Sequence, residues 1–255
     1  MQKQGTTWRY RAALAVLASC SLIAGAGADK KETPKPLPPE IVKAWLNAGA
    51  QVGWMKDVPP QAEGSYEYWA PWREKGEPGA VPAFRFHPEK QGVLTKLPDP
   101  GVAFGLDLHC WSGKDAEVKE FAGLKNLQAL NIGGALLLTD AGLKELAGLK
   151  NLQGLYLFYA PVTDAGLKEL AGLKNLHALD LSHTQVMGAG LKGLAGLKSL
   201  QALNLAYTQV TDAGLKELPG LKSLQWLNLC GTKVTAAGLA ALQKELPACK
   251  IIMAD

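Results

Sequence analysis

One stretch decides the fold: residues Thr163 to Leu181 read TDAGLKELAGLKNLHALDL. It recurs from Thr211 to Leu229 as TDAGLKELPGLKSLQWLNL, and a more altered copy lies between them, from Met187 to Leu205. An earlier copy, Val118 to Ile132, is followed by one extra residue in its Gly-Gly-Ala turn. One leucine marks the period of 24 residues, at Leu143, Leu167, Leu191, Leu215 and Leu239. A period this regular indicates copies of one unit that stack on each other.

Each copy divides into a strand and a helix by its hydrophobic period. Leu155 and Leu157 alternate with positions that face the other way, which is the period of a half-buried strand. Leu167, Leu170 and Leu173 then recur every three residues, as on one face of a helix. We therefore expect one short strand and one helix in every copy.

The residues around each predicted helix have the chemistry of caps and turns. The side chain of Thr163 or Asp164 can accept a backbone N–H bond at the start of the helix. Gly172 falls where the helix should end, so we expect it to adopt a left-handed C-cap conformation. A threonine follows three of the strands, and we expect a ladder of hydroxyl groups that bond to adjacent backbones. These threonines are Thr184, Thr208 and Thr232.

One copy cannot bury its leucines alone, but stacked copies can, with strands about 4.8 Å apart and helices on the outer arc. From about Phe104 to the C-terminus, the repeats closely resemble the leucine-rich-repeat family. The TDAGL opening is similar to a subclass of bacterial and F-box-associated repeats, which has Cys or Asn at the turn that carries threonine here. The resemblance implies an α/β solenoid over residues 104–255, with a parallel inner β-sheet and outer helices. Leu37 to Leu46 is similar to the start of an F-box, but the rest of that pattern is absent.

The beginning of the chain has the pattern of a secretion signal. A cationic region, Lys3 to Arg11, precedes an apolar run that is too short for a comfortable membrane span. Two endings compete. Leu17 to Cys20 resembles a lipobox, which would make Cys20 a lipid-bearing first residue, whereas Ala26 to Ala28 resembles an ordinary cleavage site. The sequence predicts an exported protein of the cell envelope or periplasm, with a leader of residues 1–28, or 1–19 for a lipoprotein, and no other link to a membrane.

The positive charge of the chain is concentrated in this leader. The formal net charge is +4, from 27 basic and 23 acidic residues. Three of the basic residues lie in the first 28 residues, which contain no acid, so 24 basic and 23 acidic residues remain and the net charge falls to +1. Nothing in the remainder indicates a surface that tracks phosphates, so we expect no nucleic-acid partner.

The segment before the repeats divides into a linker and a cap. Residues 29–40 are rich in proline and lysine, a composition typical of a tether. Residues 41–103 are rich in aromatic side chains, namely Trp54, Tyr66, Tyr68, Trp69, Trp72, Phe84 and Phe86. A solenoid needs an atypical element over its exposed end, so we expect an irregular N-terminal cap here. The alternative is a carbohydrate- or peptide-binding patch with Trp69 and Trp72 exposed.

Catalysis finds little support in this sequence, which contains no GxSxG elbow, HExxH helix, CxxC pair or Gly-rich phosphate loop. The best polar cluster is His177, Asp180 and His183, but the equivalent positions of neighbouring repeats carry Tyr or Asn and offer no third metal ligand. We expect no metal, no cofactor and no enzymatic activity, and we interpret both histidines as surface residues. Glutamates such as Glu145 and Glu169 partly offset the lysines of the outer helices, which favours a solvated convex face over a polyanion contact.

The concave face of the predicted sheet is more informative, because its side chains are not needed for the leucine core. Strand alternation places aromatic and amide side chains there over small residues, which suits a protein-binding patch. We expect the partner-binding residues to be Tyr156, Phe158, Tyr159, Asp180, His183, Asn204, Tyr207, Trp226 and Asn228. The sequence thus predicts an exported, non-catalytic protein-interaction module with an unknown partner. The alternative is a cell-envelope structural or polysaccharide-binding protein that uses the aromatic N-terminal segment.

Overall fold

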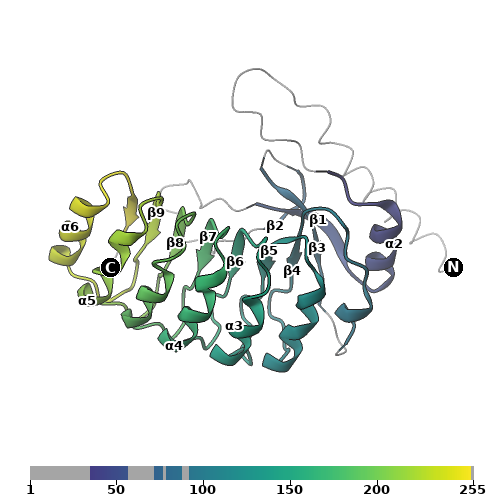
Figure 1. Cartoon of the computed structure of the whole chain (residues 1–255), viewed down its shortest axis with the longest axis horizontal. Helices are drawn as coiled ribbons and strands as arrows, with labels where there is room; N and C mark the ends of the chain where they lie inside the picture. The colour runs from purple at the N-terminus through teal and green to yellow at the C-terminus, as the bar shows by residue number, and fades with distance from the viewer. Residues whose placement is uncertain (1–34, 57–71, 77–78, 88–91, 254–255) are drawn as a thin grey trace, which may run out of the picture.

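The computed structural model describes residues 35–56, 72–76, 79–87 and 92–253, which form a curved solenoid with helices on its outer arc (Figure 1). The strands of these residues form one sheet in the order β10-β9-β8-β7-β6-β5-β4-β3-β1-β2. The strands are β1 (Gln51–Met55), β2 (Trp72–Arg73), β3 (Val81–Arg85), β4 (Phe104–Asp107), β5 (Leu127–Asn131), β6 (Gly154–Tyr156), β7 (Ala178–Asp180), β8 (Ala202–Asn204), β9 (Trp226–Asn228) and β10 (Lys250–Ile252). The helices are α2 (Pro39–Asn47), η2 (Leu94–Lys96), η3 (Asp115–Gly123), α3 (Asp140–Leu146), α4 (Asp164–Leu167), η4 (Lys168–Gly172), η5 (Ala189–Leu194), α5 (Asp212–Leu215), η6 (Leu218–Gly220) and α6 (Ala236–Glu245).

The repeats stack in register, as the 24-residue period predicts. Strands β4 to β10 pair in parallel, and each pair joins equivalent residues of successive repeats. Leu155, Leu179, Leu203 and Leu227 are therefore direct neighbours in one row, and all four are fully buried. The prediction of a parallel inner sheet with outer helices is confirmed.

The helices begin as predicted but end differently. The Thr163 hydroxyl accepts a hydrogen bond from the Ala165 N–H at the start of α4. The prediction of a left-handed C-cap at Gly172 was wrong, because its φ is not positive. A 3-10 turn ends this helix instead, with the Leu173 N–H donating to the Leu170 carbonyl, and such a turn needs no left-handed residue.

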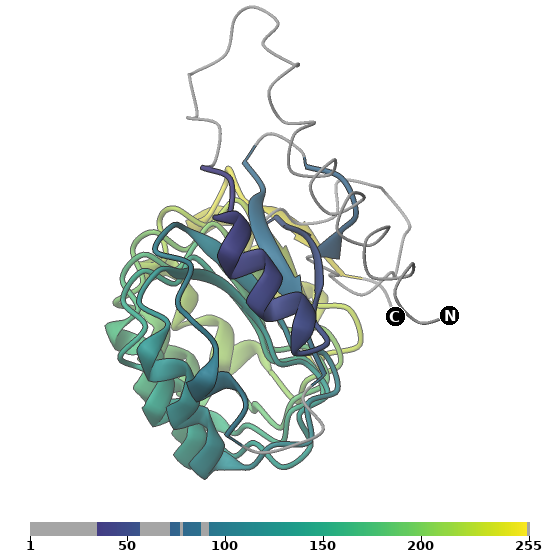
Figure 2. The ribbon, with the colours of Figure 1, turned by 90° about the vertical axis from the view of Figure 1, so that its right-hand side faces the viewer.

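Helix α2 lies at the N-terminal end of the solenoid, as the dark purple helix in Figure 2, and its Trp45 packs among aromatic side chains of β3 and β4. The rings of Trp45 and Phe84 stack at 4.4 Å between centroids, and Trp45 also meets Phe86 and Phe104 edge-on. The Trp45 indole N–H donates to the Pro98 carbonyl at 3.0 Å. Strand β3 then joins this segment to the repeats, because it pairs in parallel with β4.

Several predictions fall on residues outside the described ranges. These include the leader with Cys20, most of the 29–40 linker, and the side chains of Tyr66, Tyr68 and Trp69. Within the described ranges, every helix is too short or too polar to span a lipid bilayer.

Candidate functional site at the strand ends

The concave face of the sheet is largely buried, contrary to the prediction of free side chains there. Tyr156, Phe158 and Trp226 are at most 5% exposed, and they belong to an apolar cluster on that face. Met55 of β1 joins the cluster and Trp72 of β2 packs against it. The prediction that these three aromatics stand exposed was wrong, because they are buried in one apolar cluster on this face, which Met55 and Trp72 of the N-terminal segment also join.

Buried polar side chains shape the turn that follows each strand. The last strand residue is Asp107 in β4, and its side chain accepts a hydrogen bond from the backbone N–H two residues later. The same bond, at 2.8 to 3.2 Å throughout, is made by Asp107, Asn131, Asp180, Asn204 and Asn228. Tyr156 holds the equivalent place in β6. Asp180, Asn204 and Asn228, which we predicted as contact residues, therefore act first as turn formers.

The residue three positions after this turn former adopts a left-handed backbone conformation. Glycine fills the place in two repeats, as Gly134 and Gly231 with φ of 73° and 65°. Larger residues fill it elsewhere with φ between 55° and 60°, namely Cys110, Tyr159, His183 and Tyr207. A non-glycine residue in this region costs of order 1–3 kcal/mol. The three aromatic residues of consecutive repeats thus stand where folding alone favours glycine.

These aromatic side chains form a stack along the solenoid. The His183 ring lies 4.2 Å from the Tyr159 ring and 4.5 Å from the Tyr207 ring, with interplanar angles of 22° and 18°. A Cβ atom at Gly231 would lie 2.5 Å from the Tyr207 ring, so glycine is required beside the end of the stack. Tyr159 and Tyr207 are 39% and 48% exposed, whereas His183 is half-buried and desolvation lowers the pKa of its imidazole.

Further exposed apolar side chains lie in the same loops. We define the strand-end edge as the loops between strand and helix in the repeats of β5 to β8. Among the described residues, the exposed large hydrophobic side chains all lie on it, as Leu136, Leu137, Tyr159, Met187 and Tyr207. A shallow groove beside Met187 is lined by Thr163, Thr184 and Gln209.

Sequence reasoning missed Leu136, Leu137 and Met187 as candidates, although each departs from the repeat pattern. Met187 stands where other copies have the capping threonine. Leu136 and Leu137 lie in the copy that is one residue longer than the others. A comparison of the repeats with one another could therefore have found them, because a departure that exposes an apolar side chain serves no packing purpose.

Hydroxyl and carboxylate groups hold the loops of this edge together. The Thr184 hydroxyl donates to the Leu181 carbonyl of its own turn at 2.6 Å, and Thr208 and Thr232 do the same. The predicted threonine ladder between adjacent backbones was therefore wrong, because the hydroxyl reaches its own turn first. Aspartates form the link between repeats instead: Asp140 accepts bonds from both the N–H and the hydroxyl of Thr163.

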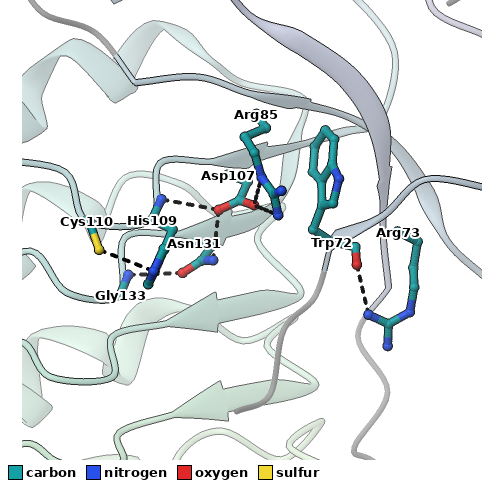
Figure 3. A network of polar contacts seen from close by, with 8 residues as sticks. All are labelled: Trp72, Arg73, Arg85, Asp107, His109, Cys110, Asn131 and Gly133. Atoms are coloured by element: carbon teal, nitrogen blue, oxygen red, sulfur yellow. Dashed lines mark hydrogen bonds and ion pairs between the residues drawn. The ribbon is translucent and has the colours of Figure 1, made fainter. Parts of the chain in front are cut away.

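The first strand end connects the repeats to the N-terminal segment (Figure 3). Asp107 is fully buried and forms an ion pair of 2.8 Å with Arg85 of β3. The Arg85 guanidinium also lies over the Trp72 ring, 4.4 Å from its centroid. The Asn131 amide donates to the other carboxylate oxygen of Asp107 at 2.8 Å. Figure 3 also shows Cys110, whose sulfur lies 3.2 Å from the His109 ring nitrogen.

The polar cluster weighed as a metal site does not converge. His177 precedes β7 and His183 follows it, so the two lie at opposite ends of one strand. Asp180 is fully buried between them and accepts bonds from the N–H and hydroxyl of Ser182. Burial raises its pKa from 3.8 to about 6, and these bonds with one from Asn204 only partly offset the effect. The described part of the chain holds no group of three ligands suited to a metal ion.

Comparisons with known proteins match the repeats and the fold. A family model for the leucine-rich repeat matches residues 172–195 and 196–218. The structure is similar to internalin C2 of Listeria monocytogenes, at 27% identity and a TM-score of 0.51, over 66% of this chain and 67% of that one. It is also similar to the internalin inlF of the same bacterium, at 21% identity and a TM-score of 0.52, over 66% of this chain and 46% of that one. No curated protein matches the sequence.

Proposed function

The chain is a leucine-rich-repeat protein, and from this premise we propose that it is an exported, non-catalytic module that binds a protein partner with its strand-end edge. The observation that carries the proposal is the gathering of exposed large hydrophobic side chains on that edge, in four consecutive repeats. Contiguous exposed apolar groups with aromatic anchors are typical of protein-binding surfaces.

The backbone of the edge supports the same function. Tyr159, His183 and Tyr207 occupy left-handed positions that Gly134 and Gly231 fill without strain. The three rings form two stacked pairs, each worth roughly 0.5–1.5 kcal/mol, which is less than the backbone cost of roughly 1–3 kcal/mol at each of the three residues. Their mutual stacking alone therefore does not account for aromatic residues at these positions, which supports a role in partner binding.

The predicted contact residues take different parts in this proposal. Tyr159, His183 and Tyr207 contact the partner, together with Met187, and Asp180, Asn204 and Asn228 shape the turns beneath them. We no longer propose a partner contact for Tyr156, Phe158 and Trp226, because they are buried in the apolar cluster of the concave face.

Export and the absence of catalysis are parts of the proposal that rest on the sequence. The cationic and apolar leader supports export to the cell envelope or periplasm, with or without a lipid on Cys20. Among the described residues the Cys110 thiol lies 3.2 Å from the His109 imidazole, but no third residue there orients that ring by a hydrogen bond, which supports a role in binding rather than in catalysis.

A glycan patch on the N-terminal aromatic segment finds less support. Of the two tryptophans predicted to expose it, Trp69 lies outside the described residues. One face of the Trp72 ring carries the Arg85 guanidinium at 4.4 Å. That face is therefore occupied, and a sugar ring could not stack on it.

Capture of partners tests the proposal. The full chain is immobilised, exposed to envelope extract of the native host, cross-linked, and the bound proteins are identified by mass spectrometry. The test variant combines Tyr159→Gly, His183→Gly and Tyr207→Gly, because glycine fits the left-handed backbone. We expect it to lose about tenfold or more of the specifically captured protein, as removal of aromatic anchors does elsewhere.

A matched control keeps this test specific. The variant Lys144→Gln, Lys168→Gln and Lys192→Gln changes three exposed side chains on the outer helices of the same stretch. It should retain the partner, and both variants should keep the wild-type circular dichroism spectrum. A partner set that survives the glycine variant unchanged removes the strand-end edge as the binding surface.

A further inference from the structure

A row of lysines follows the opposite edge of the solenoid. In five consecutive repeats a lysine directly follows the Gly-Leu pair near the end of the outer helix. We call this row the lysine edge; it consists of Lys125, Lys150, Lys174, Lys198 and Lys222. All five side chains are exposed. Successive parallel strands lie about 4.8 Å apart, so the row spans about 19 Å with a regular spacing. We infer that the lysine edge binds an acidic polysaccharide, at a site separate from the strand-end edge.

The segments of this edge carry no acidic residue of their own, although the Asp99 carboxylate reaches the first of them, where it accepts hydrogen bonds from the Asn126 N–H and side-chain amide at 3.4 and 3.0 Å. The segments from helix end to strand start contain no Asp or Glu in residues 123–128, 148–153, 172–177, 196–201 and 220–225. None of the five lysines forms an ion pair with a carboxylate of the described residues. The aspartates that alternate with them along the chain, such as Asp140 and Asp164, lie at the other ends of the helices and bond to the next repeat.

The lysines of the outer arc thus form two different rows, which corrects the view of one solvated convex face. In the helix row, Lys144, Lys168 and Lys216 are each followed directly by a glutamate, and Lys168 lies 3.9 Å from Glu169. That row is offset by its own neighbours. From Lys150 to Lys222 the segments of the lysine edge contain no such acidic neighbour, and these four charges are a linear match for an anionic polymer.

Hydrogen bonds orient the ammonium groups along the row. The ammonium groups of Lys150, Lys174 and Lys198 donate to the carbonyls of Gly172, Gly196 and Gly220, at 3.5, 3.2 and 3.0 Å. Each lysine therefore leans toward the next repeat. An ammonium group has three donors, so two remain for a ligand. Because these long side chains are already ordered, binding costs less side-chain entropy.

The neighbours of the lysines favour a polysaccharide over other polyanions. Asn, Ser, Gln and His side chains accompany the lysines in the five segments and suit the hydroxyl groups of sugars. The segments contain no Phe, Tyr or Trp on which the bases of a single-stranded nucleic acid would stack. The exposed large hydrophobic side chains of the described residues lie on the opposite edge, so none is placed to enter a lipid surface here.

Titration with polygalacturonate, a linear polymer with one carboxylate per sugar, tests the inference. Fully methyl-esterified polygalacturonate is the matched neutral ligand. Binding to the full chain is measured between about 50 and 200 mM salt, where ion-pair contacts lose affinity steeply. We expect polygalacturonate to bind with strong salt dependence and the ester not to bind.

Two variants of equal charge separate the lysine edge from overall charge. Lys150→Gln, Lys174→Gln and Lys198→Gln keeps an N–H donor at each position, and it should weaken binding at least about tenfold at 50 mM salt and lower the salt slope by about two. Lys144→Gln, Lys168→Gln and Lys192→Gln removes the same charge from the helix row and should change affinity less than about threefold.

Several outcomes would overturn the inference. These are equal losses in the two variants, binding of the methyl ester, or no binding of polygalacturonate at the lowest salt. Tighter binding to an oligothymidylate or to phosphatidylglycerol vesicles, measured on the same wild-type chain, would assign the edge to a different class of ligand. Circular dichroism of both variants confirms that the fold is retained, so a loss of binding is not a loss of structure.

Discussion

Where the outer helices begin, next to the strand-end edge, carboxylates are consumed within the fold, whereas at the lysine edge the ammonium groups retain free donors. Both oxygens of Asp140 are taken by Thr163, at 2.9 and 2.6 Å. Lys198, by contrast, gives one bond to the Gly220 carbonyl. The same repeat thus displays apolar rings and aliphatic chains at one edge and positive charge at the other.

The direction of the outer helices explains this difference. A helix leaves N–H groups without partners at its beginning and carbonyls without partners at its end. Side chains that accept hydrogen bonds, such as aspartate, are therefore favoured at its beginning, and side chains that donate them, such as lysine, at its end. Aspartate is short, and its two oxygens are used up close to the backbone. Lysine reaches a carbonyl with one donor and keeps its charged group in water. Folding therefore uses the oxygens of these aspartates in hydrogen bonds between repeats and leaves the ammonium groups of the lysine edge in water.

The largest test of this comparison is Arg85→Met, which breaks an internal charge pair at the end of β4, one repeat before the strand-end edge. Asp107 would remain buried without its cation, so we expect a loss of about 3 kcal/mol in the free energy of unfolding. Urea unfolding at pH 7, followed by circular dichroism, measures it. Lys198→Met removes a charge from the lysine edge and should cost less than about 0.5 kcal/mol. Similar losses in the two variants would contradict the contrast between the edges.

A smaller effect is expected from Asp180→Asn, which removes a buried carboxylate with no cation among its described neighbours. The folded state raises the pKa of Asp180 from 3.8 to about 6. Between these values the folded protein keeps a proton that the unfolded chain releases, so the contribution of Asp180 to stability is highest below about pH 4 and falls as the pH rises through about 6. Asparagine fits this turn, as Asn131, Asn204 and Asn228 show.

The variant should therefore be more stable than the wild type at pH 8, by about 2–3 kcal/mol. At pH 4 the difference should vanish, because protonated aspartate and asparagine are both neutral. Unfolding curves of both proteins at pH 4, 6 and 8 measure the trend. A difference that does not vary with pH would show that Asp180 is ionised equally in the folded and unfolded states.

The smallest effect compares two equivalent threonines on the strand-end side. Thr163 caps α4 and donates to Asp140, so Thr163→Ala should cost about 1–2 kcal/mol. Thr211 makes no side-chain cap bond, and the preceding repeat has Gly188 where others have the aspartate. Thr211→Ala should therefore cost less than about 0.5 kcal/mol. Thermal unfolding of both variants measures the gap, and equal costs would mean that the aspartate bridge adds nothing.

The sequence alone determined the repeating part of the molecule. The 24-residue spacing of leucines predicted the stacked parallel strands, and Leu155, Leu179, Leu203 and Leu227 do form one buried row. The cap at Thr163 was also predictable, because its partner lies two residues away. Such features follow from the sequence because neighbouring residues, repeated at a fixed period, encode them.

The tertiary structure decided which predicted side chains are available for binding. Tyr156 and Trp226 alternate correctly along their strands, yet they are buried in a cluster that Met55 and Trp72 also join. Tyr159 and Tyr207 stay exposed because a turn in the left-handed conformation aims them outward. The repeat pattern of the sequence predicts neither the burial of the first pair nor the exposure of the second. The burial depends on packing between distant residues, and the exposure depends on the backbone conformation of the turn. Strand alternation assigns a side chain to a face, but only the packing on that face decides whether the side chain meets solvent.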